Sequence, residues 1–302
     1  MLGVYGAASS DWVGDGFPVR TIFPSYGVSD LSPFLMLDYA GPAQFKPSNR
    51  PRGVEQHPHR GFETVTIAYH GSVDHRDSAG NSGTINPGDV QWMTAASGVV
   101  HEEMHGKDFT AKGGDFEMVQ LWVNLPAAVK MSKPGYQGIV RAQIPRVELG
   151  TGAYARVIAG ELNGIKGPAK TFTPVNVFDV QLEAGGRGEL RLPVGQNAAI
   201  VLLQGDVLVN GSTALKGEAR IAPLTPSGES VVLEAKAETL LLVLSGEPIN
   251  EPVASYGPFV MNTQAELRQA LQITRRAAWA TCTKLAPIER KISYGYSMHT
   301  SR

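Results

Sequence analysis

The sequence predicts an all-β protein built from two antiparallel β-barrels, with a short helix near the C-terminus. Three observations predict this fold. The 34 glycines and 20 prolines are spread over the whole chain and divide it into short segments separated by turn signals, a pattern typical of sandwiches and barrels. A glycine-based pattern occurs once in each half of the 302 residues, and only one segment has convincing helical periodicity.

The apolar pattern of short strands occurs at residues 64–69, 89–93, 118–124, 198–203, 206–209 and 239–244. The segment that ends at Val209 leads directly into Asn210-Gly211. This dipeptide is the strongest short signal for a β-hairpin, because both central residues of the favoured turn need a positive φ. We therefore expect a tight hairpin at Asn210-Gly211.

The repeated pattern is a turn glycine followed some residues later by a second glycine and an acid. It occurs as Gly71 with Gly88-Asp89 and again as Gly205 with Gly217-Glu218. We expect the first glycine of each copy to end a strand, because glycine tolerates a positive φ. Two similar barrels explain a length about twice the ~150 residues of a common domain, and chance recurrence is the alternative for so short a match. The predicted units are residues 1–133, 134–262 and 263–302.

The third unit begins with the predicted helix and ends in a basic tail. Thr263 and Glu266 have the spacing of a capping box. One face of the helix then carries Leu267, Ala270, Leu271 and Thr274. Beyond it, residues 275–302 contain six lysines and arginines against one acid, Glu289. We expect an unpacked or partner-bound extension here, and a functional basic arm is the alternative.

Composition excludes several classes of protein. The 42% hydrophobic fraction with 18% charged residues excludes general disorder, and a net charge of -1 excludes nucleic-acid binding through bulk positive charge. The single cysteine, Cys282, excludes an internal disulfide and a cysteine zinc site, which indicates a reducing compartment. No signal peptide is recognisable, and no apolar run reaches the ~20 residues needed to span a bilayer. We therefore expect a soluble, cytoplasmic protein without a membrane partner.

Six of the seven histidines lie between His57 and His105, and the second predicted barrel has none. In an extended strand His57 and His59 point to the same face, and so do His101 and Glu103. Two neighbouring strands that each offer two ligands can enclose one divalent ion. Three imidazoles and a carboxylate suit a transition metal with open coordination positions, and the spacing alone accepts iron, manganese, nickel, copper or zinc.

The alternative to a metal site is that these histidines are ordinary surface or core residues. Two other side chains share the parity of the pairs if their strands continue unbroken: Glu63 with His59, and His105 with His101. We expect His70 and His75 to lie at the surface beside the Gly71 turn. Arg60 faces away from the pair by parity, so we expect a solvated side chain, with a supporting role at the site as the alternative.

These residues resemble the motifs of a known family. The stretch from His57 to Val65, His-Pro-His-Arg-Gly-Phe-Glu-Thr-Val, is similar to the first metal-binding motif of the pirin family, a branch of the cupin superfamily. Residues 86–95, followed by Gly98 and 101–104, are similar to its second motif. Further matches at 14–20, 33–38, 130–137, 251–253 and 257–263 extend the resemblance over about residues 10–272. The string His-Glu-Glu-Met-His at 101–105 is more polar than is usual in this family.

The resemblance implies a bicupin of two jelly-roll barrels packed face to face. The N-terminal barrel would hold one Fe(II) per chain through His57, His59, His101 and Glu103, and the C-terminal barrel would have no metal. It further implies a dioxygenase of the quercetin 2,3-dioxygenase type that acts on a small aromatic substrate and dioxygen. Glu103 would then serve as both ligand and catalytic base. The substrate pocket would be lined by inward side chains such as Phe62, Trp92 and Met104, although the last two serve equally well as core filling.

The family also includes redox-dependent regulators. The competing interpretation is therefore a sensor whose iron site, without turnover, alters contact with a protein partner such as a transcription factor or a metabolic enzyme. No direct nucleic-acid binding is expected in either case. A purely structural ion is the weakest interpretation, because structural zinc sites mostly recruit thiolates.

Overall fold

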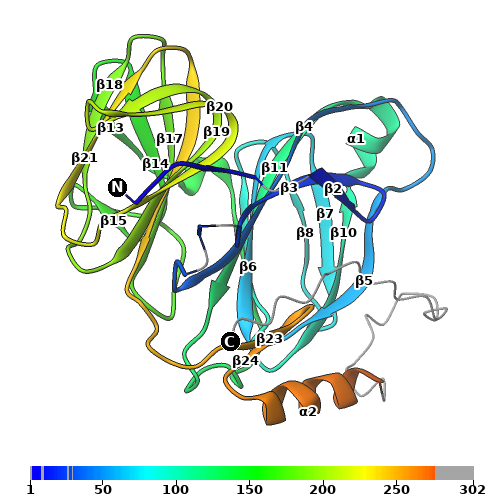
Figure 1. Ribbon diagram of the computed structural model, residues 1–302. Coiled ribbons are helices and arrows are strands. Elements are labelled where there is room, and N and C mark those ends of the chain that lie inside the picture. The colour runs from blue at the N-terminus through cyan, green and yellow to red at the C-terminus, as the bar shows by residue number, and fades with distance from the viewer. Residues whose placement is uncertain (1, 8–9, 26, 29, 276–302) are drawn as a thin grey trace.

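The computed structural model describes residues 2–7, 10–25, 27–28 and 30–275. The chain forms two β-sheet lobes that lie side by side, the first built mainly from its N-terminal half and the second mainly from its C-terminal half (Figure 1). All pairs between named strands are antiparallel. The prediction of an all-β fold is confirmed. In the first lobe two separate sheets, and no single closed barrel, enclose the interior.

The larger sheet of the first lobe has the order β12-β9-β6-β11-β4-β3-β2. Its strands are β2 (Ser10–Val13), β3 (Phe17–Phe23), β4 (Phe34–Phe45), β6 (Phe62–His70), β9 (Val90–Thr94), β11 (Gly114–Asn124) and β12 (Gly135–Ile139). The smaller sheet has the order β5-β10-β7-β8. Its strands are β5 (Gly53–His59), β7 (Val73–Asp77), β8 (Ser82–Ile85) and β10 (Val99–His105). A short helix, α1 (Lys107–Lys112), follows β10.

The second lobe is a nine-stranded sheet. Its strands are β1 (Tyr5–Gly6), β13 (Arg146–Gly150), β14 (Ala153–Ala159), β17 (Val175–Leu182), β18 (Arg187–Arg191), β19 (Asn197–Val209), β20 (Thr213–Leu224), β21 (Ser230–Ala235) and β22 (Thr239–Gly246). Two small hairpins complete the strands: β15 (Glu161–Leu162) with β16 (Ile165–Lys166), and β23 (Ala254–Tyr256) with β24 (Phe259–Met261). The helical elements are η1 (Arg141–Gln143), a 3-10 turn, and α2 (Gln264–Arg275).

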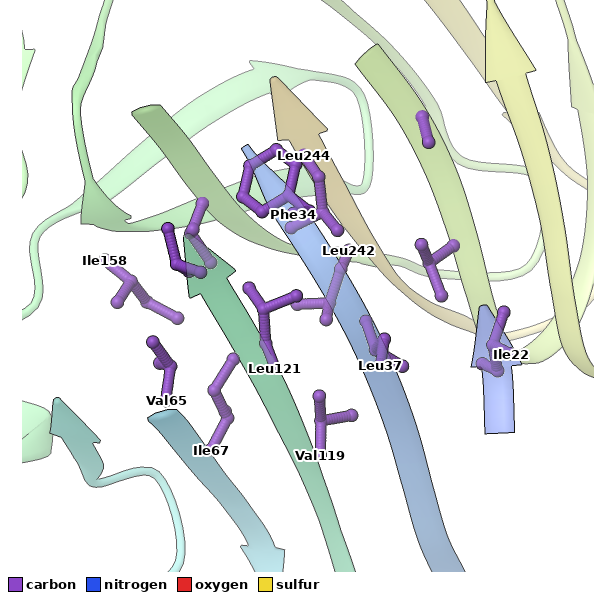
Figure 2. Close-up of a cluster of buried hydrophobic side chains, with 14 of the residues drawn as sticks. Ile22, Phe34, Leu37, Val65, Ile67, Val119, Leu121, Ile158, Leu242 and Leu244 are labelled. Carbon is purple, nitrogen blue, oxygen red and sulfur yellow. The ribbon is translucent and has the colours of Figure 1, made fainter. Parts of the chain in front are cut away.

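The two lobes share one apolar core, which packs them face to face. Side chains alternate along β6, so that Val65 and Ile67 point toward the second lobe while Thr66 points into the first. From the second lobe, Leu242 and Leu244 of β22 enter the same cluster, as Figure 2 shows. The hydrophobic contact between the lobes is therefore continuous, and separating the lobes would expose it to water.

The predicted hairpin at Asn210-Gly211 is confirmed, since both residues have a positive φ and join β19 to β20. The predicted runs 198–203 and 206–209 form the single strand β19. Gly205 lies inside that strand with φ +121°, where a Cβ atom would come within 2.4 Å of the Thr239 hydroxyl. The expectation that Gly205 ends a strand is therefore wrong, whereas Gly71 does lie in the turn between β6 and β7.

The predicted C-terminal helix is confirmed as α2, and its capping box forms. The Glu266 carboxylate accepts a hydrogen bond from the Thr263 backbone N–H at 2.8 Å, and the Thr263 hydroxyl accepts one from the Glu266 N–H at 3.2 Å. The buried face of α2 packs on β23 and β24 below the first lobe (Figure 1). No helix in the part of the chain described is long and apolar enough to cross a bilayer. The basic tail beyond Arg275 lies outside the described residues.

Strand pairing crosses the predicted unit boundaries. The N-terminal strand β1 pairs with β20 of the second lobe, and β12 pairs with β9 of the first. After β22 the chain returns to the first lobe, where the Arg60 N–H donates to the Pro258 carbonyl and the Val260 N–H donates to the Arg60 carbonyl. The division at residues 133 and 262 stays a prediction.

We expect Leu121→Ala to lower the free energy of unfolding by about 2–5 kcal/mol, because Leu121 is fully buried in the shared core and its truncation leaves a cavity. The matched control is Leu2→Ala, at an exposed leucine, which should change it by about 0.5 kcal/mol or less. Urea unfolding followed by circular dichroism measures both. Equal, small effects of the two substitutions would contradict a core shared between the lobes.

Candidate metal centre

Three imidazoles meet inside the first lobe. The pairing of β5 with β10 places His101 opposite His57 and Val99 opposite His59. One ring nitrogen from each of the three histidines lies within 4.8 Å of the others. His59 and His101 are buried and His57 is half-buried. The structure thus brings together the three histidines that the sequence spacing selected, and they could hold a metal ion.

A hydrogen bond orients the His57 ring. His57 Nδ1 lies 2.8 Å from the Glu55 carbonyl, which only accepts, so Nδ1 carries the proton and Nε2 keeps its lone pair. Among the described residues, His101 Nε2 and both ring nitrogens of His59 have no hydrogen-bond partner of normal geometry. Buried nitrogens without partners cost free energy. A metal ion coordinated by one lone pair of each ring would remove the part of that cost that falls on the coordinating nitrogens, so the residues present fit a metal.

The protonation state of the cluster also suits a metal. Burial lowers the pKa of His57, His59 and His101, and each neighbouring imidazole would add repulsion if it were charged. At neutral pH the three rings are therefore neutral imidazoles, the form that coordinates metal ions.

Glu103 is held beside the three histidines but is not one of the clustered ligand atoms. It is buried on β10, two residues beyond His101, and a register shift against β5 separates the two. Its carboxylate accepts a hydrogen bond from the Thr66 hydroxyl at 3.2 Å and one from the Gln120 side-chain amide at 2.8 Å. These contacts join the carboxylate to β6 and β11, and its role as a ligand and base stays a prediction.

The two alternative ligands are not part of the cluster. The extended strand is interrupted between β5 and β6 at Gly61, which has φ +87°. The alternation of side chains therefore starts again in β6, and Glu63 does not share the parity of His59. Glu63 instead lies on the other face of β6 from Thr66 and accepts a hydrogen bond from the Thr94 hydroxyl at 2.7 Å. Burial raises the pKa of Glu63 to about 7.

His105 occupies an aromatic environment at the other end of β10. Its Nε2 lies 2.8 Å from the Gly16 carbonyl, so it donates a hydrogen bond there. Its ring stacks on Phe116 at 4.7 Å between centroids and contacts three more phenylalanines, Phe17, Phe45 and Phe109. His105 is therefore part of the apolar packing of the first lobe.

A buried lysine, Lys130, stabilises the turn at Gly61 through hydrogen bonds. Lys130 Nζ donates to the Gly61 carbonyl at 2.7 Å, to Asn124 Oδ1 at 2.6 Å and to the Val260 carbonyl at 3.2 Å. Burial lowers the pKa of Lys130 to about 8. A Cβ atom at Gly61 would lie 1.9 Å from the Val260 carbonyl oxygen, so only glycine fits.

Two expectations about side-chain exposure are wrong. His70 is exposed, as predicted, but His75 is 3% exposed and approaches His101, with 3.4 Å between their Nδ1 atoms. Arg60 is 2% exposed where a solvated side chain was expected, and its Nη2 points to the sulfur of Met131 at 3.1 Å. Arg60 is buried because the returning strand β24 pairs with its backbone. Sequence spacing does not reveal that long-range contact.

The wall beside the imidazoles is aromatic. Phe62 and Trp122 contact each other at 4.2 Å between ring centroids, and both contact His59. Phe62 thus lies at the site as expected. Trp92 does not, because it belongs to the core shared between the lobes, and this agrees with its interpretation as core filling. Met104 lies one residue beyond Glu103 and so points to the opposite face of β10.

Comparison with known proteins places both halves of the chain in one family. Residues 16–123 match the family model described as Pirin, and residues 177–278 match that of the Pirin C-terminal cupin domain. A protein of Pseudomonas aeruginosa named "putative quercetin 2,3-dioxygenase" is 54% identical over 275 residues, which is 90% of this chain and 95% of that protein.

Solved structures agree with this assignment. The crystal structure of a quercetin 2,3-dioxygenase from Acinetobacter baumannii has a TM-score of 0.89 and 50% identity, and the match covers 93% of this chain and 98% of that one. A bacterial pirin from Escherichia coli, solved in complex with nickel(II), has a TM-score of 0.63 at 16% identity and covers 82% of this chain and all of that one. The second match shows a common fold.

We expect substitution of His57, His59 or His101 by alanine to weaken metal binding by more than about 100-fold. Loss of a residue that only hydrogen-bonds to a ligand typically weakens it by about 10–100-fold, and loss of a ligand should cost more. The controls are His105→Phe and Glu63→Gln, which alter buried side chains outside the cluster and should leave the bound metal unchanged. Elemental analysis of protein purified without added metal, with competition titrations, measures the effect. Full metal content in all three alanine variants would contradict a site at this cluster.

The carboxylate is tested separately. Glu103→Ala should reduce bound metal and Glu63→Ala should not, because only Glu103 lies on the face of the imidazoles. The reverse result would mean that the wrong carboxylate is assigned.

Proposed function

This chain belongs to the pirin family, and we propose that it is an iron-dependent dioxygenase that opens a flavonol such as quercetin, or a related aromatic compound, at the centre formed by His57, His59 and His101. The observation that carries the proposal is the meeting of three neutral imidazoles, of which His59 and His101 are buried and hold ring nitrogens without a protein partner of normal geometry. The names of the relatives from Pseudomonas and Acinetobacter support the reaction type.

Each ligand has a defined place in this proposal. His57, His59 and His101 would hold the iron, with Glu103 as the fourth ligand. Bound iron would supply open coordination positions for a substrate oxygen and for dioxygen. Iron is inferred from the family, and the nickel(II) bound by the Escherichia coli pirin makes nickel the first alternative to test.

Glu103 is the residue proposed to move a proton. The carboxylate of Glu103 would accept the proton of a substrate hydroxyl at one of its oxygens. Thr66 and Gln120 already donate hydrogen bonds to the two oxygens, which keeps the carboxylate in one orientation. Trp122 Nε1 in turn lies 3.5 Å from Gln120 Oε1 and orients that amide. The base would therefore be positioned before substrate binds.

The aromatic wall supports a flat substrate. Phe62 is fully buried and fixes one face of the site, while Trp122 is only half-buried. Stacking on an aromatic ring contributes about 0.5–1.5 kcal/mol beyond area burial, and it favours planar ligands over aliphatic ones.

The cytoplasmic location stays a prediction.

We expect anaerobically iron-loaded protein mixed with quercetin to consume the flavonol and release carbon monoxide once oxygen is admitted. Glu103→Gln should slow turnover by about 10²–10⁴-fold through loss of the base. His105→Phe, which alters a histidine outside the cluster, is the matched control and should turn over normally. Flavonol absorbance and carbon monoxide release are followed together. Absence of turnover by the iron-loaded protein would contradict the dioxygenase.

One observation favours a second function, a redox-sensing protein that acts through a protein partner. His59 is followed directly by Arg60, whose backbone pairs with Pro258 and Val260 of the returning segment. Movement of His59 would therefore be passed to β24 and to α2, which packs on it. A change of ligand geometry at the site would in this way reach an outer surface.

If this sensor operates, amide hydrogen exchange in β24 and α2 should differ between ferrous and ferric protein, because the Arg60–Val260 hydrogen bond tightens or loosens with His59. Exchange in β18 and β21, at the far side of the second lobe, is the internal control. Identical exchange in both oxidation states would contradict the sensor function.

A further inference from the structure

A hydrogen-bonded chain leads away from the candidate metal centre through residues that the proposed function does not use. His101 Nδ1 lies 3.4 Å from His75 Nδ1, and His75 Nε2 lies 3.4 Å from Asp77 Oδ2. All three side chains are buried. In the β10–β7 pair His101 lies opposite Asp77 and Glu103 lies opposite His75, so the backbone register itself brings the chain together.

Asp77 is fixed as the acceptor at the end of this chain. The backbone N–H groups of Ala79 and Asn81 both donate to Oδ1 at 2.9 Å, and the Asn81 side-chain amide donates to Oδ2 at 2.9 Å. Oδ2 is therefore held toward His75. On the other side, the His75 ring stacks on Tyr136 at 5.1 Å between centroids, which fixes the plane of the imidazole.

The proton positions along the chain follow from donor and acceptor rules. A carboxylate oxygen accepts, so His75 Nε2 must carry the proton that it donates to Asp77. In the neutral ring His75 Nδ1 then carries the lone pair, and it accepts a hydrogen bond from the N–H at His101 Nδ1. His101 Nε2 is consequently without a proton, and it is the nitrogen that has no partner within the described residues.

We propose that Asp77 and His75 are positioning residues that set the tautomer of His101, so that its Nε2 lone pair faces the metal. The inference rests on the proposed metal site and deepens it. His75 is not itself a ligand in this arrangement, because the nitrogen nearest the site points at His101. Outer partners of this kind fix the ring orientation of a ligand and increase its basicity.

The substitution Asp77→Asn inverts the chain at nearly constant size, and the Asn81 side-chain amide, which donates to Oδ2 in the wild type, must turn its own oxygen toward the new NH₂ group. The two backbone N–H groups keep an oxygen at the position of Oδ1, so the new amide turns its NH₂ group toward His75 Nε2. Two donors cannot face each other, and His75 must therefore place its proton on Nδ1. That proton is donated to His101 Nδ1, and His101 is left with its proton on Nε2, the nitrogen that would coordinate the metal.

The test uses the full-length protein labelled with ¹⁵N and free of metal. Long-range ¹H–¹⁵N correlation spectra should show His101 protonated at Nδ1 in the wild type and at Nε2 in Asp77→Asn, with the signal assigned by its loss in His101→Asn. Competition titration with Fe(II) should give about 10–100-fold weaker binding in Asp77→Asn. The control Asp74→Asn alters an aspartate of the same strand that bonds Thr84 and the Lys107 N–H instead, and it should change neither result.

A second variant keeps the inference falsifiable if Asp77→Asn does not fold. His75→Phe preserves the stack on Tyr136 and removes the acceptor, so His101 should show a mixture of tautomers and weaker metal binding. A wild-type His101 protonated at Nε2, or unchanged affinity in both variants, would overturn the inference. The predicted tautomer without any metal binding by the wild type would instead overturn the proposed function.

Discussion

The register between β5 and β10 is the constraint on which the site depends. Because side chains alternate along a strand, a slip of one residue would turn His101 and Glu103 out of the lobe and bring Glu102 and Met104 in. The register is held from both sides, since β10 pairs with β5 on one edge and with β7 on the other. The β5–β10 pairing brings His57 to His101, and the β10–β7 pairing brings Asp77 and His75 to the other edge of the same strand.

The two lobes use a similar architecture for different purposes. The interior of the second lobe holds one apolar cluster, whereas that of the first combines an apolar cluster around Phe45 and Phe116 with the three imidazoles and their aromatic wall. Burying polar groups lowers stability unless they have partners. The core shared between the lobes adds apolar burial to that of the first lobe, so the second lobe stabilises the fold that holds the imidazoles together.

The sequence predicts those parts of the site that depend on the direction of side chains along a single strand. It does not predict the parts that depend on contacts between distant segments. Alternation along single strands is enough to place His57 and His101 on inward faces. Glu63 would share the parity of His59 only on an unbroken strand, and the break at Gly61 resets that parity. The sequence also misses His75, although the alternation of His75 and Asp77 on one strand was a signal, because only the β10–β7 pairing shows what that face contacts.

The break at Gly61 explains why the C-terminal segment returns to the first lobe. A turn that exposes its carbonyl inside the protein needs a donor, and Lys130 supplies it while also bonding Val260. A buried ammonium group is costly to desolvate, so its three acceptors must all stay in place. Removing the returning strand would take one acceptor from Lys130 and the backbone partners from Arg60. The geometry of His59 therefore depends on residues two hundred positions away, and the turn that follows His59 is complete only when the C-terminal segment has returned.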